Sequence, residues 1–288
     1  MKGLFTNNLL KLSQTKDQLD WIKNKDNEDE VVDTGYFSRY LSIEKFINLI
    51  VNNHLRFSRF DMFDDPIEGG TQVNIQDIVT FKDQSFNVEE YNQNIALEII
   101  EGYIKNAKSS LEKAKEELEI AQSNGYGLCL YYNENGISES RIMWNLYSNP
   151  IGVVMYIPAL YLDNLLRKRI TYPEFIAQGY YGRANYEDIF STEFFAKESD
   201  SKTRFFTKDK SYEHEREYRY VLATEETIEN TTGIYARLPD NTIIDFCAHP
   251  DMPNHIFNDL KSILKKYSPK STFNRSKLFG RSVFGNLK

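Results

Sequence analysis

Apolar residues repeat at alternating steps of three and four between residues 88 and 122, which is the clearest periodic pattern in the chain. The repeat comprises Leu97, Ile100, Ile104, Ala107, Leu111, Ala114, Leu118 and Ala121. This spacing predicts a long amphipathic helix with one apolar seam, and Ser123, Asn124 and Gly125 are expected to end it. The seam packs either on its own domain or a neighbouring helix, or it forms a partner-binding or dimerising arm.

Short apolar segments with β-branched and aromatic residues predict strands both before and after this helix. Before it, we expect a strand ending at Leu41, a helix beginning at Ser42, a second strand in "HLRFSRF" and a turn in "FDDPIEGG". After it, the predicted strands are "YGLCLYY", "IGVVMYI", "IAQGYYG", "EYRYVLA" and "TIIDFCA". Further helices are expected at 138–147, 158–168, 186–198 and 256–267, and residues 1–34 are expected to form a leading helix and a joint.

This order of elements predicts an α+β fold built as one large domain. The domain is expected to span residues 35–259, with the helical insertion at about 86–124. Residues 260–288 form a separate basic segment, because they contain eight of the 35 Lys and Arg residues and none of the 42 Asp and Glu residues. Aromatic residues interleave with these cations. The segment between Lys261 and Lys288 therefore either binds nucleic acid or docks on the acidic body of the protein.

Two cysteines, Cys129 and Cys247, lie in apolar segments and have no zinc-binding spacing. We expect both to be reduced core residues of a cytoplasmic protein. The first residues lack a basic region followed by an unbroken apolar stretch, and no window approaches eighteen apolar residues. We therefore expect neither a signal peptide nor a membrane-spanning helix.

Two carboxylates stand at the front of one predicted strand, in the segment Glu215-Arg216-Glu217-Tyr218-Arg219. If the whole segment is a strand, Glu215, Glu217 and Arg219 share one face. Two like charges side by side repel, which a site that needs two acids would explain. An exposed edge strand with solvated charges is the alternative.

Recognised catalytic signatures are missing from the rest of the sequence. There is no glycine-rich phosphate loop and no Gly-x-Ser-x-Gly motif, and the four histidines have no metal-ligand spacing. We expect no bound metal. Asp61, Asp64, Asp65 and Glu68 form the acidic cluster that a metal-dependent nuclease would need, which leaves a nuclease as a weaker hypothesis.

Four motifs in order, covering about residues 36–223, resemble the bacterial family described as domain of unknown function 2971. They are "FSRYLS", "LRFSRFDMFDDPIEGG", "RIMWNLYSNPIGVVMYI" after "LCLYY", and "FFTKDKSYEHEREYRYVLA". The chain departs from the family pattern at Asp64, where Asn is usual, at Ile67, which replaces an aromatic residue, and at Tyr212, where Trp is common.

The order of the polar groups also resembles ADP-ribosyltransferases, in which a basic-aromatic pair, a strand with Ser and a late Glu-x-Glu follow one another. This looser resemblance implies a split β core with flanking helices and NAD as the co-substrate. It implies that Glu217 is the catalytic carboxylate and that Glu215 acts on the acceptor. Arg39 would hold the diphosphate, Tyr40, Trp144 and Tyr147 would stack or contact the ribose, and Ser58 and Arg219 would complete the cofactor site.

Two functional hypotheses follow from these residues. The first is an NAD-dependent mono-ADP-ribosyltransferase that acts on RNA, DNA or protein as a toxin or phage-defence effector. The second is a non-catalytic module that senses nucleic acid or binds a partner or inhibitor protein through the 88–122 helix. For each proposed site residue a purely structural role is the alternative: Arg39 and Arg219 would pair with the glutamates, and Trp144 and Tyr147 would form a core stripe.

Overall fold

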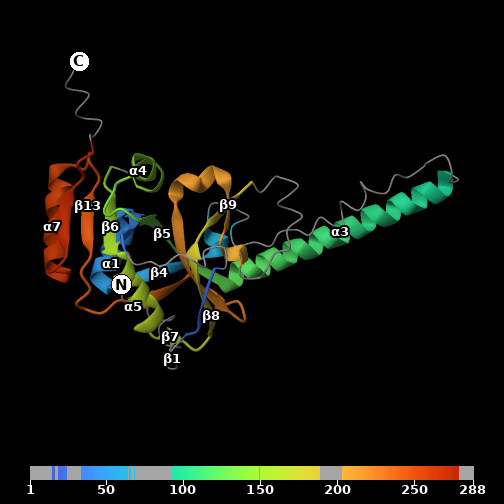
Figure 1. Cartoon of the computed structure of the whole chain (residues 1–288), viewed down its shortest axis with the longest axis horizontal. Coiled ribbons are helices and arrows are strands. Elements are labelled where there is room, and N and C mark those ends of the chain that lie inside the picture. Colours follow the sequence, from blue (N-terminus) through green and yellow to red (C-terminus); the bar gives the residue numbers. More distant parts are fainter. Residues whose placement is uncertain are drawn as a thin grey trace, which may run out of the picture.

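The computed structural model describes residues 15–16, 19–24, 34–63, 65, 68, 93–148, 150–188 and 203–278. Within these residues the fold is a mixed α/β arrangement around one large sheet (Figure 1). No helix in the described part has the length and apolar character needed to cross a membrane.

The large sheet runs in the order β14-β13-β6-β3-β5-β11-β8-β2, with β4 and β12 attached beside β5. Its strands are β2 (Trp21–Lys23), β3 (Tyr36–Leu41), β4 (His54–Arg59), β5 (Gly125–Asn133), β6 (Val153–Pro158), β8 (Ile176–Arg183), β11 (Glu217–Thr224), β12 (Gly233–Arg237), β13 (Asp245–Ala248) and β14 (Thr272–Arg275). The sheet is mixed, because β13–β14 and β2–β8 pair in parallel and the other neighbours pair antiparallel.

Strand β5 pairs with two different strands along one of its edges. Its end pairs with β3 from Tyr131 to Asn133, whereas its beginning pairs with β4 at Tyr126 and Gly127. The opposite edge of β5 pairs continuously with β11. Strands β3 and β4 therefore diverge from a shared neighbour, and the side chain of Arg39 reaches across, donating to the Arg56 carbonyl at 3.1 Å.

Helices cover both faces of this sheet. On one face, α1 (Ile43–Asn52), α5 (Ala159–Lys168) and α7 (Asn254–Tyr267) bury their apolar stripes against Phe37, Leu128 and Tyr218. On the other face, α4 (Arg141–Tyr147) packs Met143 and Trp144 against Tyr40. This division follows from strand alternation, since Phe37 and Tyr40 lie three residues apart in β3 and face opposite sides.

Strand β11 shows how the sequence assigns these faces. Tyr218, Tyr220 and Leu222 lie in the helix-covered core, as their alternation predicts. Glu217, Arg219 and Val221 face the other side, where Val221 packs with Phe60, Phe205 and Phe206 in a second aromatic cluster. The polar end of β11 is thus placed on the face that carries α4.

Helix α3 (Gln93–Asn124) confirms the long helix expected from the apolar repeat, and it projects from the sheet as an arm (Figure 1). Its 32 residues correspond to about 48 Å. Ala121 is buried and Leu118 is half-buried where the helix meets the sheet. The side chains of the other seam residues lie outside the described part, so burial of the seam stays a prediction.

Shorter elements complete the described chain. These are the strands β1 (Thr15–Lys16), β7 (Tyr172–Pro173), β9 (Asn185–Glu187) and β10 (Thr207–Asp209), and the 3₁₀ helices η2 (Phe60–Met62), η4 (Thr203–Phe205) and η5 (Lys210–Glu215). Strand β1 pairs with β7, and β9 pairs in parallel with β10.

Three expectations about segment boundaries need correction. Within 1–34 the described residues include the strands β1 and β2 where a joint was expected, whereas residues 1–14 lie outside the described part, so the leading helix stays a prediction. The expected helix at 186–198 begins instead as strand β9, and residues 189–198 lie outside the described part. Residues 260–278 are no separate tail, since they belong to α7 and β14 of the sheet domain, whereas 279–288 lie outside the described residues.

Candidate functional site

The candidate site begins where the 3₁₀ helix η5 turns into strand β11. Asp209 caps η5 by accepting a hydrogen bond from the Ser211 amide at 2.9 Å. Arg216 then adopts a left-handed conformation with φ 43°, which is uncommon for a residue with a Cβ. This turn corrects the expectation of one continuous strand, because Glu215 ends the 3₁₀ helix and Glu217 begins the strand.

Both carboxylates nevertheless reach the same place. Lys208, on β10, contacts Glu215 Oε2 and lies 3.1 Å from Glu217 Oε1. The Lys208 ammonium therefore bridges the two acids that the sequence placed two residues apart. Its own pKa is raised, because the neighbouring carboxylates outweigh the desolvation that would lower it.

A second cation holds the other side of Glu217. Arg219 donates through Nε to Glu217 Oε2 at 2.7 Å, contacts Glu68 Oε1, and donates through Nη1 to the Phe205 carbonyl at 2.7 Å. Arg219 is fully buried and Glu215 is 1% exposed, whereas Glu217 retains 9% exposure. Glu217 is thus the more accessible member of the carboxylate pair.

The charges in this buried cluster, defined as Glu68, Lys208, Glu215, Glu217 and Arg219, do not balance when every group is ionised. Three carboxyl groups face two cations, so one proton is expected to be shared among the acids. The electrostatics place that proton on Glu215, whose pKa is raised to about 7 by burial, by the charge of Glu217 and by a hydrogen bond between the two carboxyl groups.

Glu217 shows the opposite behaviour. Its burial alone would raise its pKa, but Arg219 and Lys208 lower the pKa to about 2. The site therefore contains one carboxylate that stays ionised and one carboxyl that gains or loses a proton near neutral pH. Divergent pKa values in neighbouring acids are the usual arrangement for separate electrostatic and acid–base roles.

Three tyrosines contact the cluster. Tyr147, on α4, donates its hydroxyl to Glu215 Oε1, although its own side chain is 42% exposed. Tyr186, on β9, accepts a hydrogen bond from the Glu217 amide at 2.8 Å. The ring of Tyr212 lies 4.7 Å from the Lys208 ammonium in cation–π geometry. Tyr147 therefore links the protein surface directly to the buried acid.

The pairing register decides which residue of β3 lies in line with Glu217. Glu217 pairs with Tyr131 of β5, and Tyr131 pairs with Ser38 of β3. Ser38, and not its neighbour Arg39, therefore shares the row and face of Glu217. Arg39 remains within electrostatic range of Glu217, but its pKa is lowered, chiefly by burial.

The other proposed cofactor residues have structural partners. Trp144 is buried, donates its indole N–H to Glu139 at 3.0 Å and meets the Tyr40 ring edge to face at 4.9 Å. Tyr40 accepts a hydrogen bond from the Ser140 amide at 2.7 Å. Ser58 pairs with Gly127 of β5 and therefore lies on the face of Glu217, farther along the sheet. Of the three proposed aromatic contacts, Tyr147 is the one that touches the carboxylate pair.

Sequence reasoning assigned no role to Lys208 and placed Glu68 in a different kind of site. Lys208 lies on β10 and Glu215 ends η5, so no single strand or helix relates the two. Glu68 lies in the turn that was expected to hold a metal-binding acidic cluster, but it faces Arg219 instead. Asp61 pairs with Arg59 at 2.7 Å, and Asp64 lies outside the described residues. Glu68 and Asp61 thus pair with different arginines.

Glu68, Cys129 and Glu217 place ligand-type atoms within 4.8 Å of one another, which raises the question of a metal. The donor set fits one poorly, for two reasons. Arg219 already contacts both carboxylates, and burial raises the pKa of the Cys129 thiol, which keeps it protonated. We therefore assign this cluster no metal.

Comparison with known proteins provides no further identification. No protein-family model, curated protein or solved structure matches this chain.

Proposed function

We propose that the protein is an NAD-dependent mono-ADP-ribosyltransferase that uses Glu217 and Glu215 as its catalytic pair. The observation that carries this proposal is geometric: Lys208 bridges the two carboxylates, and Tyr147 connects Glu215 to the surface. The electrostatics agree, since the pKa of Glu217 is lowered to about 2 and that of Glu215 is raised to about 7. Glycosyl-transfer chemistry needs both properties. A permanent anion stabilises the oxocarbenium-like ribose, and a titrating carboxyl handles the acceptor proton.

In the proposed reaction, the bond between nicotinamide and ribose C1′ breaks and nicotinamide leaves with the electron pair. Ionised Glu217 stabilises the positive charge that develops on the ribose. An acceptor nucleophile then forms the new bond at C1′, and its proton moves to the site. Glu215 receives this proton in its ionised form, which predominates above about pH 7. Because Glu215 is buried and Tyr147 is exposed, the proton passes through the Tyr147 hydroxyl, which accepts it while donating its own to ionised Glu215.

The divergence of β3 and β4 from β5 supports a split β core of the ADP-ribosyltransferase type. Arg39 lies at this divergence and is the cation proposed to hold the NAD diphosphate. In the absence of ligand its guanidinium donates to the Arg56 carbonyl, so binding would exchange that acceptor for phosphate oxygens. A role as toxin or phage-defence effector and membership of the family resembled by the motifs remain part of this proposal.

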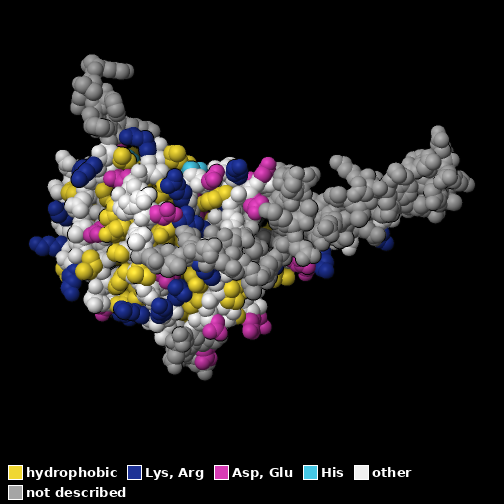
Figure 2. Space-filling model, in the orientation of Figure 1, with side chains coloured by type: hydrophobic (Ala, Val, Ile, Leu, Met, Phe, Trp, Pro, Cys, Tyr) yellow, Lys and Arg dark blue, Asp and Glu magenta, His cyan; other side chains and the backbone are white. Residues whose placement is uncertain are grey.

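The acceptor is proposed to be RNA, DNA or protein. The exposed lysines of α7 offer a phosphate-binding surface, and Figure 2 shows Lys and Arg side chains along the edge formed by α7. Helix α7 packs on the sheet face opposite Glu217. A nucleic acid that contacts both the α7 lysines and the Glu217 site must therefore pass around the edge of the sheet. A protein acceptor needs to contact only the face that carries Tyr147.

The test uses NAD labelled in the adenylate, with total RNA, DNA and nuclease-treated cell extract as separate acceptors. We expect label to enter one acceptor class with the unmodified chain. Glu217→Gln should lose incorporation by about two orders of magnitude or more, as when an electrostatic stabiliser is removed. Glu226→Gln is the matched control, because Glu226 is exposed just beyond β11. Equal incorporation by both variants would contradict the proposal.

A second candidate is a non-catalytic module that binds a partner. The projection of α3 from the sheet favours it, since an arm of 32 residues presents a long surface away from the carboxylate pair. In this function the buried cluster only stabilises the fold. Removal of α3 would then abolish the cellular effect, whereas Glu217→Gln would leave that effect intact in protein that still folds.

A further inference from the structure

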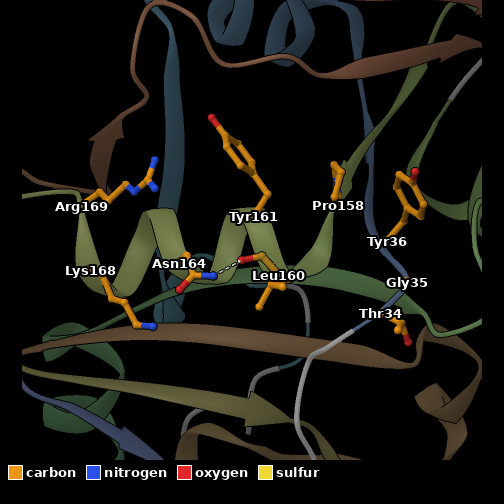
Figure 3. Close-up of a pocket in the computed structure, with 9 residues that line it drawn as sticks. All are labelled: Thr34, Gly35, Tyr36, Pro158, Leu160, Tyr161, Asn164, Lys168 and Arg169. Atoms are coloured by element: carbon orange, nitrogen blue, oxygen red, sulfur yellow. Dashed lines mark hydrogen bonds between the residues drawn. The ribbon is translucent and has the colours of Figure 1, made fainter.

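A groove runs along the exposed side of helix α5, apart from the carboxylate pair. Its volume is about 660 Å³, which is within the range of small-molecule sites. Figure 3 shows Tyr161 between Arg169 at one end of the helix and Pro158 and Tyr36 at the other. The groove therefore combines cationic groups at one end with aromatic rings along its length.

Two cations of the groove have no acidic partner within the described part of the chain. Three basic residues follow one another at the end of α5, and the first, Arg167, is held by buried Asp163 at 2.8 Å. Lys168 and Arg169 line the groove, and neither has a carboxylate partner among the residues that the structure describes. None of the residues lining the groove is acidic. Lys168 and Arg169 stand at the C-terminal end of α5, where the helix dipole stabilises positive charge. The dipole does not explain why both cations line a concave site.

The aromatic rings give the groove a second property. Tyr36 and Tyr161 are each half-buried, so one part of each ring packs on the core and the rest faces outward. A ring fixed in this way loses little conformational freedom when a flat ligand stacks on it. Leu160, which is 47% exposed, adds an apolar contact on the other side of the helix in Figure 3.

We propose that this groove is a nucleotide-binding site in which Lys168 and Arg169 bind the phosphates and Tyr161 stacks on the base. Two cations beside an aromatic ring can bind the phosphates and the base of a nucleotide at the same time. An inorganic anion would use only the cations, and an apolar ligand would use only the ring. Helix α5 and strand β3 both contribute residues, so the site is built on regular elements. The proposal does not require Glu217 to be catalytic.

The pairing register of β3 gives the position of the groove relative to the carboxylate pair. Tyr36 lies two residues before Ser38 on β3, and Ser38 shares its row with Tyr131 and Glu217. Two strand spacings separate Ser38 from Glu217, which is about 10 Å. The groove therefore lies near the same end of the sheet as the carboxylate pair but on the opposite face, as a nucleotide-binding position separate from the proposed reaction site.

The test is calorimetric binding of ADP, adenosine and pyrophosphate to the full chain. We expect ADP to bind more tightly than either fragment. The double variant Lys168→Gln/Arg169→Gln should weaken ADP by about tenfold or more, since two phosphate contacts are lost. Tyr161→Leu should weaken ADP but not pyrophosphate, whereas Tyr161→Phe should retain ADP binding because the ring remains.

Controls separate a specific site from general attraction to cations. Lys45→Gln/Arg237→Gln removes two exposed cations, one on α1 and one on β12, and should leave ADP binding unchanged. Circular dichroism melting checks that each variant folds. The proposal is overturned if ADP does not bind at millimolar concentration, or if the Lys168/Arg169 variant binds it as the unmodified chain does. It is also overturned if pyrophosphate binds as tightly as ADP and Tyr161→Leu has no effect, because the groove would then take anions without a base.

Discussion

Tyr147 donates its hydroxyl to the Glu215 carboxyl across 68 residues of sequence, and this bond joins the surface of α4 to the most deeply buried acid of the cluster. Glu215 alone could not exchange a proton with a bound acceptor, since it is 1% exposed. The Tyr147 hydroxyl connects Glu215 to the surface and can pass the proton between them. A role in proton transfer therefore predicts that Tyr147 matters more for activity than for folding.

Tyr147→Phe removes the hydroxyl and keeps the ring. We expect transfer to an acceptor to fall by about tenfold or more, because the proton relay is broken. The free energy of unfolding should fall by only about 1 kcal/mol, as for one hydrogen bond. Urea denaturation and labelled-NAD incorporation measure the two effects. Loss of stability with unchanged transfer would assign Tyr147 a structural role.

The raised pKa of Glu215 predicts a pH dependence of stability. Its ordinary value is 4.5 and its value in the folded protein is about 7, so between these the folded state binds more protons than the unfolded state. The free energy of unfolding should therefore fall as pH rises from about 4.5 to about 7. The lowered pKa of Glu217 affects stability only in more acidic solution. The stabilising contribution of its negative charge is lost as pH falls from 4.5 toward about 2.

Glu215→Gln tests this directly, because glutamine does not titrate. The difference in unfolding free energy between the unmodified chain and the variant should decline across pH 4.5–7 and then level off. Burial also raises the pKa of Glu68, so some slope should remain in the variant itself. A difference that is constant from pH 4 to 8 would mean that Glu215 holds no extra proton.

Removal of one cation from the buried cluster should destabilise the protein strongly. Arg219→Met removes one of the two cations that Glu68 and Glu217 share, and breaking a buried ion pair in this way typically costs about 3–5 kcal/mol. Arg237→Gln is the control, since Arg237 is exposed on β12 and should change stability by less than about 0.5 kcal/mol. Similar melting temperatures for the two variants would show that the cluster does not hold the fold together.

The sequence was sufficient for the parts of the fold that follow a regular period. Alternation in β11 predicted that Glu217 and Arg219 face away from Tyr218, and the apolar repeat predicted α3. Strands β12 and β14 were not predicted, because each is short and buries few side chains. Their place in the sheet depends on long-range pairing, which local pattern does not encode.

The candidate site was predictable only in part, for a similar reason. The Glu-x-Glu spacing pointed to a site, but the route of Glu215 into it depends on the left-handed turn at Arg216, which no local signal indicated. Lys208 reaches the acids from β10, whose pairing with β9 lies outside any local pattern. Trp144 and Tyr147 lie three residues apart, which predicts one helix face, but Trp144 is buried and Tyr147 is exposed at the last residue of α4.

The lysines of α7, together with Lys270 just after it, predict a salt-dependent interaction if nucleic acid is the acceptor. Replacing Lys261, Lys265, Lys266 and Lys270 by Gln should weaken nucleic-acid binding and reduce the slope of its salt dependence. Arg275 is left in place, because it donates to the Met252 carbonyl and supports the fold. Binding that is unaffected by these replacements, or that does not vary with salt, would favour a protein acceptor.

The most direct test of the central claim is the rate of nicotinamide release from NAD by the unmodified chain and by Glu217→Gln, assayed with and without acceptor. The substitution keeps the size and hydrogen bonding of the side chain but removes the charge that stabilises the ribose cation. We predict release by the unmodified chain and a loss of about a hundredfold or more in the variant, with the Glu226→Gln control unchanged. Absence of release with every acceptor, or equal release by folded Glu217→Gln protein, would contradict catalysis by this carboxylate.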